Sequence, residues 1–442
     1  MTDQKTRKII LLNVRAEYPP EIALNDAHPI VRACRRTAWY AEEGDVIASP
    51  LSFEPDFLDH VGGSLGFDAR TISVVVRGRL LTDDVILAPD FIAELREAIA
   101  GHPKWRLSAC FLTEGVAELA EQLGVEFAGA AFAAERGGDL LNRKSHFRQL
   151  AAGVGMPLAA GGVAQSPERL AQMIEKWLPD TGAVIVKQEN AGGGLGNVLL
   201  ATDDIGPLPG AREIRKIGKD IGATAEKLWV ELFQEQHPGL VVEVYHPDTR
   251  HMFYVEYLID DSGNPHFLNS ARFKLVHAGS SEDPYLSWVG LELPADVPPH
   301  SLSRALTHAT RFATLVSQVG YRGYINIDAI VTASGELIFN EVNGRWAGGT
   351  VLHTVAARLL GEDYADHCVA SSLRDVRPMK LKTALDAIRD HGLELDLERR
   401  DGVVVLYCDS AENENSEFLL IGSSAERVRE LETALRAAVS DQ

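Results

Sequence analysis

Two carboxylates and an amide lie inside otherwise apolar runs in the C-terminal half of the chain. The stretch YINIDAIVTASGELIFNEVNGRWAGG carries Asp328 in its first run and Glu341 and Asn343 in its second. If the runs pair around a tight turn at Ser334 and Gly335, Asp328 lies directly opposite Glu341. Directly opposed Cβ atoms are about 5 Å apart, so the carboxylates repel unless a cation lies between them. Such oxygen ligands suit Mg²⁺ shared with phosphate oxygens.

Side-chain alternation along these strands predicts one polar and one apolar face. The polar face is expected to carry Asn326, Asp328, Leu337, Phe339, Glu341 and Asn343. The other face is expected to carry Ile325, Ile327, Val331, Ile338 and Val342. Arg345 follows at the same end in a glycine-containing loop, where a planar guanidinium suits bidentate contact with phosphate. A half-exposed hairpin with a solvated acidic edge is the alternative interpretation.

A lysine and a glycine cluster supply positive charge and backbone donors. In AVIVKQENAGGGLG, Lys187 interrupts an apolar strand, and the cluster that follows contains Gly192, Gly193, Gly194 and Gly196. Glycines let backbone N–H groups approach phosphates, and the lysine adds a point charge. The cluster leads into a further strand, NVLLA, without the Gly-Lys-Ser/Thr of a Walker loop or the helix of a dinucleotide fingerprint. We expect a flap over a nucleotide, with a flexible hairpin tip as the alternative.

Two more segments offer nucleotide contacts. Lys144 shares a helix face with Phe147 and Ala151, so it borders the buried side, although a lysine that snorkels off a core helix has the same pattern. KLWVELFQEQHPGLVVEV is expected to form a strand, a short linker and a second strand. The backbone of such a linker can bond to adenine while a carboxylate binds the ribose hydroxyls. Glu231 and Glu243 are the candidates for that carboxylate, and either also fits a surface position.

The elements that must position these residues fall into three predicted parts. Over residues 1–138, strand-like runs at 8–14, 44–50, 71–76 and 105–111 alternate with helix-length segments, including 28–40 and 90–100, which predicts an open parallel α/β sheet. Over 139–374, consecutive strands indicate antiparallel α+β structure, with helices at 140–155, 301–319 and 350–361. Residues 375–442 predict a small α+β unit: a helix at 381–391, a hairpin and a final helix.

Composition narrows the possible classes of function. The 442 residues are 45% hydrophobic and 24% charged, which is typical of globular proteins, and the formal net charge of −20 disfavours nucleic-acid binding. The four cysteines, Cys34, Cys110, Cys368 and Cys408, are widely spaced and are expected to be free thiols in a reducing compartment. No apolar stretch approaches the roughly 18 residues of a membrane span, and no signal peptide is apparent. We therefore expect a cytoplasmic protein without membrane partners.

The order of these segments along the chain resembles that of the ATP-grasp superfamily. A lysine on a helix comes first, followed by the lysine with its glycine flap, the linker, and the Asp-x(12)-Glu-x-Asn hairpin. NRKSHFRQLAAGVGMP, VKQENAGGGLGN and NEVNGRWAGGT more narrowly resemble the peptide ligases of the pheganomycin-biosynthesis type, which belong to secondary metabolism. The resemblance covers nearly the whole chain. It implies an ATP-grasp fold with a Rossmann-like pre-ATP-grasp domain at the N-terminus and a small C-terminal appendage.

The resemblance also implies roles for single residues. Lys144 and Lys187 would bind the α- and β-phosphates of ATP, the backbone near Phe233 would meet adenine, and Glu243 would bind ribose. The metal ligands would be Asp328, Glu341 and Asn343, which would hold two Mg²⁺ ions (or Mn²⁺) with Glu341 bridging. Arg272 and Arg345 would stabilise the transferring phosphoryl group. Many relatives carry an arginine two residues before the metal aspartate, whereas this chain has Asn326, so which arginine acts is open.

The implied reaction activates a small-molecule carboxylate as an acylphosphate and joins it to the amine of an amino acid or peptide. Two alternatives are a small-molecule kinase of the same fold and a nucleotide-binding module that catalyses no reaction. Gly-Gly-Ser64-Leu-Gly matches the motif of serine hydrolases, but it follows a helix-like stretch and precedes a strand, the wrong context for a nucleophile elbow. Substrate selection is expected to depend on residues 261–290, and a homodimer is an expectation from the superfamily.

Overall fold

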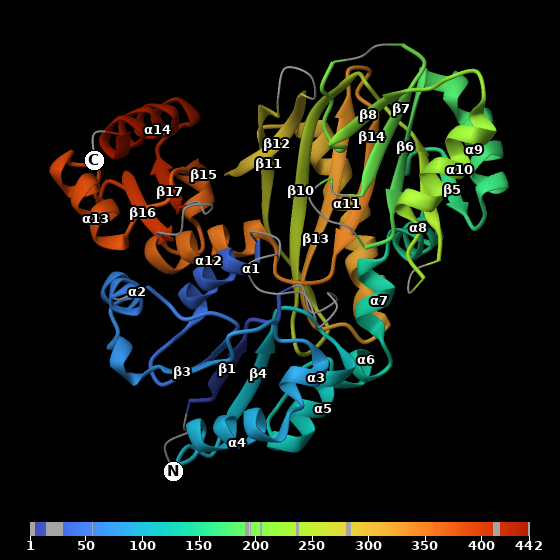
Figure 1. Cartoon of the computed structure of the whole chain (residues 1–442). Helices are drawn as coiled ribbons and strands as arrows, with labels where there is room; N and C mark the ends of the chain where they lie inside the picture. The colour runs from blue at the N-terminus through green and yellow to red at the C-terminus, as the bar shows by residue number, and fades with distance from the viewer. Residues whose placement is uncertain are drawn as a thin grey trace.

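The computed structural model describes residues 5–14, 30–54, 56–190, 194, 196–203, 206–235, 238–279, 284–409 and 416–440. These residues form three β-sheets with helices packed around them (Figure 1). The mixed α/β class predicted from the sequence is confirmed. The division into residues 1–138, 139–374 and 375–442 stays a prediction.

The N-terminal sheet has four strands in the order β3-β2-β1-β4, and every pairing is parallel. Its strands are β1 (Arg7–Leu11), β2 (Val46–Ser49), β3 (Ser73–Val76) and β4 (Trp105–Ala109). Helices α3 (Asp83–Ile86), α4 (Pro89–Ala98) and α5 (Glu114–Leu123) supply apolar side chains to one core with these strands. The open parallel sheet expected here is therefore confirmed.

The single helix expected over 28–40 is divided in the structure. A short α1 (Ile30–Ala33) continues as a 3₁₀ segment, η1 (Cys34–Tyr40), which the structure buries except for Tyr40 at its end. The rest of this part contains α2 (Phe57–Leu65) and η2 (Ala69–Thr71), followed later by α6 (Ala130–Ala134) and α7 (Gly137–Asn142). Segment η1 reaches the central cavity, whose wall includes Cys34, Arg36 and Thr37.

An antiparallel sheet of eight strands forms the centre of the molecule, in the order β14-β13-β10-β11-β12-β15-β17-β16. The strands are β10 (Thr249–Ile259), β11 (Pro265–Gly279), β12 (Pro284–Leu293), β13 (Gly323–Thr332), β14 (Leu337–Asn343), β15 (Val369–Val376), β16 (Gly402–Tyr407) and β17 (Ser416–Gly422). Helix α11 (Pro299–Gln318) packs its apolar side on one face of the first strands. Helix α12 (Gly348–Leu360) follows β14 and is followed by η3 (Tyr364–Asp366).

The third sheet lies beside the central one and has the order β5-β9-β6-β7-β8 (Figure 1). Its strands are β5 (Gly161–Ala164), β6 (Ala183–Gln188), β7 (Asn197–Ala201), β8 (Glu213–Lys216) and β9 (Leu240–Val244). Helices α8 (Lys144–Gly153), α9 (Pro167–Thr181) and α10 (Ile221–Leu232) accompany it. The strand expected over residues 227–233 is wrong: they belong largely to α10, whose buried Ala225, Leu228 and Leu232 follow helical spacing.

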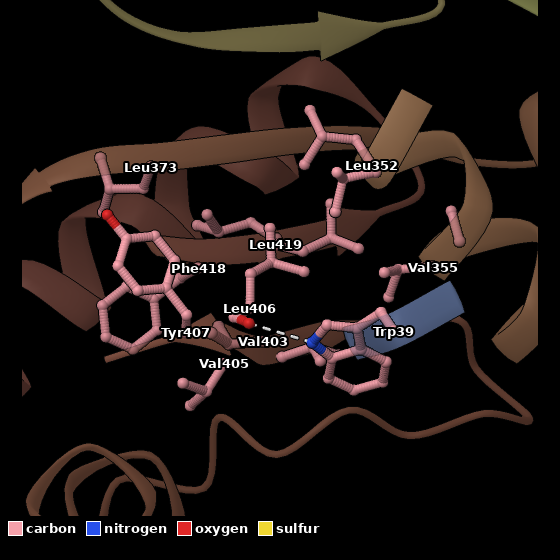
Figure 2. Packing of buried hydrophobic residues seen from close by; sticks show 14 of the residues in the cluster. Trp39, Leu352, Val355, Leu373, Val403, Val405, Leu406, Tyr407, Phe418 and Leu419 are labelled. Atoms are coloured by element: carbon pink, nitrogen blue, oxygen red, sulfur yellow. Dashed lines mark hydrogen bonds between the residues drawn. The ribbon is translucent and has the colours of Figure 1, made fainter. Parts of the chain in front are cut away.

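Helices α13 (Leu381–Asp390) and α14 (Ala425–Ser440) pack against β15–β17 at the end of the central sheet. This region shares one hydrophobic core with the N-terminal part, and Trp39 inserts its ring among side chains of β16, β17 and α12 (Figure 2). The indole Nε1 of Trp39 donates a hydrogen bond of 3.0 Å to the carbonyl of Leu406 (Figure 2). Among the helices that the structure describes, none has the length and apolarity needed to cross a membrane.

Candidate active site

The hairpin of β13 and β14 brings the two carboxylates together. Asp328 pairs with Glu341, and Asn326 pairs with Asn343, which is the register predicted from the sequence. The turn differs from the prediction, because Gly335, at φ 83°, closes a three-residue loop in which its N–H bonds to the carbonyl of Thr332. A bulge between Asp328 and Ala329 then restores the opposition of the carboxylates.

Because of the bulge, some side chains of this hairpin lie on the face opposite to the one predicted from the sequence. Because Ala329 pairs with Phe339 while Asp328 pairs with Glu341, Asn340 is the extra residue of β14. One extra residue moves the side chains on one side of it to the opposite face. Leu337 and Phe339, which were expected on the polar face, therefore pack in the apolar core. Ile338, which was expected in that core, pairs instead with Ile330, a residue of the cavity wall.

The electrostatics around Asp328 fit a cation. Its Oδ1 atom is buried and accepts no hydrogen bond. Burial, and then the neighbouring Glu341, raise the pKa of Asp328 well above its ordinary value, so a cation between the two carboxylates would lower it again. Among the described residues no group of three or more His, Cys, Asp or Glu side chains could hold a metal ion. A cation here would instead meet the two carboxylates and the amide oxygen of Asn343, which line the same cavity, and would take its remaining ligands from phosphate oxygens.

Lys144 lies beside the carboxylate pair. Its Nζ is 3.6 Å from Glu341 Oε2, and its side chain is 6% exposed. The start of α8 is fixed to the end of β6, because the backbone N–H groups of Lys144 and Ser145 bond to the carbonyl and the side chain of Glu189. Burial lowers the pKa of Lys144, although the nearby Glu341 acts to raise it. The sequence prediction that Lys144 borders the buried side of its helix is confirmed.

Arg345 is fixed at the end of the same hairpin. Its Nη1 donates to Asn343 Oδ1 at 2.5 Å and to Asn142 Oδ1 at 3.2 Å. Asn142, at the end of α7, also bonds through its side chain to the backbone N–H and carbonyl of Gly344. The Arg345 guanidinium lies over the Phe111 ring, 5.3 Å from its centroid. Asn142 is not identifiable from the sequence, because no local motif distinguishes it.

Lys187 is held by a buried cluster of charges in the third sheet. Its Nζ lies 2.5 Å from Glu243 Oε2, and Arg148 of α8 forms an ion pair with the other oxygen of the same carboxylate. Burial acts to raise the pKa of Glu243, but the two cations outweigh it and lower the pKa below the ordinary value. Glu243 thus positions Lys187 in the structure. Arg148 was not predicted as a site residue, although its position four residues after Lys144 places both on one helix face.

The glycine flap connects β6 to β7. Gly194 and Gly196 have φ values of 76° and 67°, a backbone conformation that glycine adopts without strain, and Gly194 lines the cavity. Gly192 and Gly193 lie outside the described residues. The Asn197 side chain donates to the carbonyl of Gly210 at 2.7 Å and so links the flap to the segment before β8.

Four residues singled out from the sequence lie away from the cavity lining. Glu231 of α10 forms an ion pair of 2.7 Å with Arg215. Phe233 stacks on Trp229 and is 41% exposed. Arg272 of β11 pairs with Glu292 at 2.8 Å. Ser64 lies in the last turn of α2, so the context of a hydrolase nucleophile is absent. Their predicted roles gain no support from this geometry.

A cavity of 680 Å³ brings together most of the charged side chains of the site, although Lys144 is not part of its wall. It lies between the central sheet, the third sheet and the N-terminal part, and its wall includes Lys187, Glu243, Asp328, Glu341, Asn343 and Arg345. The arrangement offers an acidic pair for cations and basic side chains for phosphates in one partly enclosed space. Such a space can hold a nucleotide and a second molecule beside it.

Comparison with known proteins agrees with this geometry. Residues 34–125 match the family model of the pre-ATP-grasp domain. The biotin carboxylase domain of the 2-oxoglutarate carboxylase of Hydrogenobacter thermophilus, solved with MgADP, ADP and bicarbonate, aligns with a TM-score of 0.59 at 14% identity, covering 99% of this chain and 95% of that one. Among curated proteins, no sequence matches the chain.

Two further structures align over similar lengths. Biotin carboxylase of Campylobacter jejuni, in a complex described as β-γ-ATP, gives a TM-score of 0.58 at 15% identity, and the alignment covers 97% of this chain and 91% of that one. The N5-carboxyaminoimidazole ribonucleotide synthetase of Thermus thermophilus gives 0.57 at 12% identity and covers 98% and 99%. The chain therefore has the ATP-grasp fold, with a pre-ATP-grasp domain at its N-terminus.

Proposed function

We propose that this protein is an ATP-dependent carboxylate–amine ligase that joins an acid to the amine of an amino acid or peptide, as the peptide ligases of the pheganomycin-biosynthesis type do. The observation that carries the proposal is the buried, unpartnered Asp328 oxygen opposite Glu341, with Lys144 and Arg345 adjacent. Solved structures of the same fold that contain ADP, magnesium and bicarbonate support an ATP-dependent ligase in general. The motifs NRKSHFRQLAAGVGMP, VKQENAGGGLGN and NEVNGRWAGGT support the narrower proposal that the amine belongs to an amino acid or a peptide.

The residues would divide the work between the metal and the phosphates. Asp328, Glu341 and Asn343 would hold Mg²⁺, which neutralises phosphate charge and polarises the γ-phosphoryl group when bound. Lys144 and Lys187 neutralise the remaining phosphate charge from α8 and from the third sheet. Arg345, kept in place by Asn142 and Asn343, donates to the phosphoryl oxygens as charge develops on them. Positioning and charge neutralisation are the main contributions a protein makes to phosphoryl transfer.

The reaction proceeds in two balanced steps. A carboxylate oxygen of the acid attacks the γ-phosphorus, the bond to the bridging oxygen breaks, and ADP leaves, which yields an acylphosphate. The amine nitrogen then attacks the activated carbonyl carbon, phosphate leaves with the bonding electrons of the C–O bond, and the nitrogen loses a proton. Water must be kept from the acylphosphate until the amine attacks, because hydrolysis would consume the activated acid.

Incubation of the full-length protein with ATP, Mg²⁺ and a panel of N-modified amino acids and short peptides tests the proposal. ADP and phosphate release are measured, and products are identified by mass spectrometry. The expected product has the mass of the acid plus the amine minus water, with one ADP formed per bond. ADP formation that requires an alcohol and no amine, with phosphate found on a hydroxyl, would identify a kinase instead. Nucleotide binding without turnover would identify a sensor.

A further inference from the structure

One end of the cavity is distant from the carboxylate pair and is lined by two arginines. Arg36 comes from η1 of the N-terminal part, and Arg374 comes from β15. Trp288 of β12 lies beside them in the cavity wall, and the Arg374 guanidinium lies 4.3 Å from the centroid of its ring. We use the term distal subsite for Arg36, Arg374 and Trp288.

The distal subsite has more positive than negative charge. Arg36 Nη1 lies 2.5 Å from Glu417 Oε2, and Arg374 Nε lies 3.5 Å from the same oxygen. Two guanidinium groups therefore share one buried carboxylate. The adjacent carboxylate of Asp375 is already paired with Arg436 at 2.7 Å. An uncompensated buried cation is costly, and a bound anion removes that cost.

Unused donors point to the same conclusion. Arg374 Nη1 and Trp288 Nε1 are buried and have no hydrogen-bond partner. Burial lowers the pKa of Arg374, although Glu417 acts to raise it. The Arg374 side chain lines the cavity and keeps 15% of its surface exposed. A planar carboxylate suits such a fork of donors.

The wall between the two ends of the cavity is mostly apolar. It includes Met252, Phe273, Leu275, Leu291 and Trp346. In the order of the sheet, β10, β11 and β12 separate β13, which carries Asp328, from β15, which carries Arg374. Four inter-strand steps correspond to roughly 19 Å at about 4.8 Å each. A ligand that contacts both ends is therefore elongated, with an apolar body and an anionic group at one end.

We propose that the distal subsite binds the free carboxylate of the amine substrate. The inference rests on the proposed ligase function. The acid uses its carboxylate at the phosphoryl group, whereas an amino acid or peptide that donates its amine retains a carboxylate at the opposite end. Since an extended chain spans about 3.3–3.6 Å per residue, the separation of the two ends selects a short peptide over a single amino acid.

The experiment compares amine donors of one to five residues, each offered with a free C-terminal carboxylate and as the C-terminal amide. Every reaction contains ATP, Mg²⁺ and the carboxylate substrate identified in the product screen. KM and kcat are measured from ADP release, with products confirmed by mass spectrometry. For the wild-type protein we expect the amide to raise KM by about 10- to 100-fold with little change in kcat, because a charge-assisted hydrogen bond is lost. We also expect peptides to be preferred over single residues.

Arg374→Gln is expected to raise KM for the free acid to that of the amide, so the preference disappears, while Arg374→Lys retains part of it. Arg399→Gln, which changes an exposed arginine of the same region paired with Asp396, is the matched control and is expected to keep the wild-type preference. A purely structural role of Arg374 would reduce activity with acids and amides alike.

Each other outcome overturns a defined part of the proposal. The carboxylate-binding role of the distal subsite is overturned if the wild-type protein uses free acids and amides equally, or if Arg374→Gln keeps the wild-type preference. Neither result contradicts the proposed ligase function. If Arg374→Gln does not fold, the wild-type comparison and Arg374→Lys decide. If the wild-type protein joins no donor of either kind, the ligase function fails, and the assignment of the distal subsite fails with it.

Discussion

At the scale of single residues, the site combines groups that destabilise the protein when no cation is present. Asp328 and Glu341 are opposed across a hairpin, and an oxygen of Asp328 has no partner. The raised pKa of Asp328 reflects its burial and then the repulsion from Glu341. Functional sites often retain such unfavourable charge because a bound ligand relieves it.

Asp328→Asn and Glu341→Gln are each expected to abolish ADP formation, because each removes a charged ligand of the metal. Asp328→Asn is also expected to raise the melting temperature of the metal-free protein by about 1–2 °C, because the carboxylate repulsion disappears. The stabilisation that MgATP gives to the wild-type protein is expected to vanish in both variants. Differential scanning fluorimetry with and without MgATP measures these shifts.

The control for this pair is Glu336→Gln, which removes an exposed carboxylate from the turn of the same hairpin. It is expected to keep both turnover and the MgATP shift. Turnover near the wild-type level in Asp328→Asn or in Glu341→Gln would show that these side chains are not metal ligands.

The residue scale is also where the sequence was most informative. The opposition of Asp328 and Glu341 was predicted from the strand pattern and from a tight turn at Ser334 and Gly335. The turn is one residue longer than predicted, and the bulge in β14 offsets that difference, so the predicted register holds. The bulge at Asn340 could not be predicted, because its position depends on the packing of Leu337 and Phe339 against α11 and its neighbours rather than on a local motif. Asn142 and Arg148 were missed because their roles depend on segments distant in the sequence.

At the scale of elements, a row of polar side chains crosses the central sheet beneath the site. Glu256 of β10 pairs with Asn269 of β11 and Asn326 of β13, and Asn326 pairs with Asn343 of β14. The Glu256 carboxylate accepts hydrogen bonds from the side chains of Asn269 and of Thr350 in the first turn of α12. Burial raises the pKa of Glu256 to about 7, although these two donors act to lower it.

Glu256→Gln is expected to change how stability depends on pH. Because the pKa of Glu256 is higher in the folded than in the unfolded protein, its contribution to the free energy of unfolding falls as pH rises from about 4.5 through 7. Relative to the wild type, the variant is therefore expected to gain about 2 kcal/mol between pH 5 and pH 8. Urea unfolding at both pH values measures the difference.

Glu336→Gln serves as the control here too, because it removes an exposed carboxylate outside this polar row and is expected to keep the pH dependence of the wild type. The Glu256 interpretation fails if the stability difference between Glu256→Gln and the wild type is the same at pH 5 and pH 8.

Elements differed in how well the sequence predicted them. The four parallel strands were clear because buried strands are continuous apolar runs bounded by turn residues. The sequence of residues 227–233 predicts a strand because the segment is rich in aromatic and branched residues. The buried Ala225, Leu228 and Leu232 show that the helical pattern begins upstream, at a helix whose start is capped by Asp220. The cap was the signal that could have corrected the prediction.

At the scale of the whole molecule, the N-terminal part and the C-terminal region share a core. Trp39 is fully buried among residues of β16, β17 and α12 (Figure 2). Arg358 of α12 donates to the carbonyls of Trp39 and Ala41. Arg36 of the same segment forms the ion pair with Glu417 of β17. The C-terminal strands therefore hold η1 in the position where it lines the cavity.

Trp39→Ala is expected to lower the free energy of unfolding by about 3–5 kcal/mol, because a large cavity replaces the ring and the bond to Leu406 is lost. Since the core spans both regions, calorimetry is expected to show the transition of both parts shifting together. The variant is also expected to raise KM for the amine donor more than KM for ATP, because η1 carries Arg36.

Trp177→Ala, in the separate core of the third sheet, is the matched control and is expected to leave KM for the amine donor unchanged. Two transitions in Trp39→Ala, of which only one is shifted, would show that the N-terminal part unfolds independently and that the C-terminal strands do not hold η1.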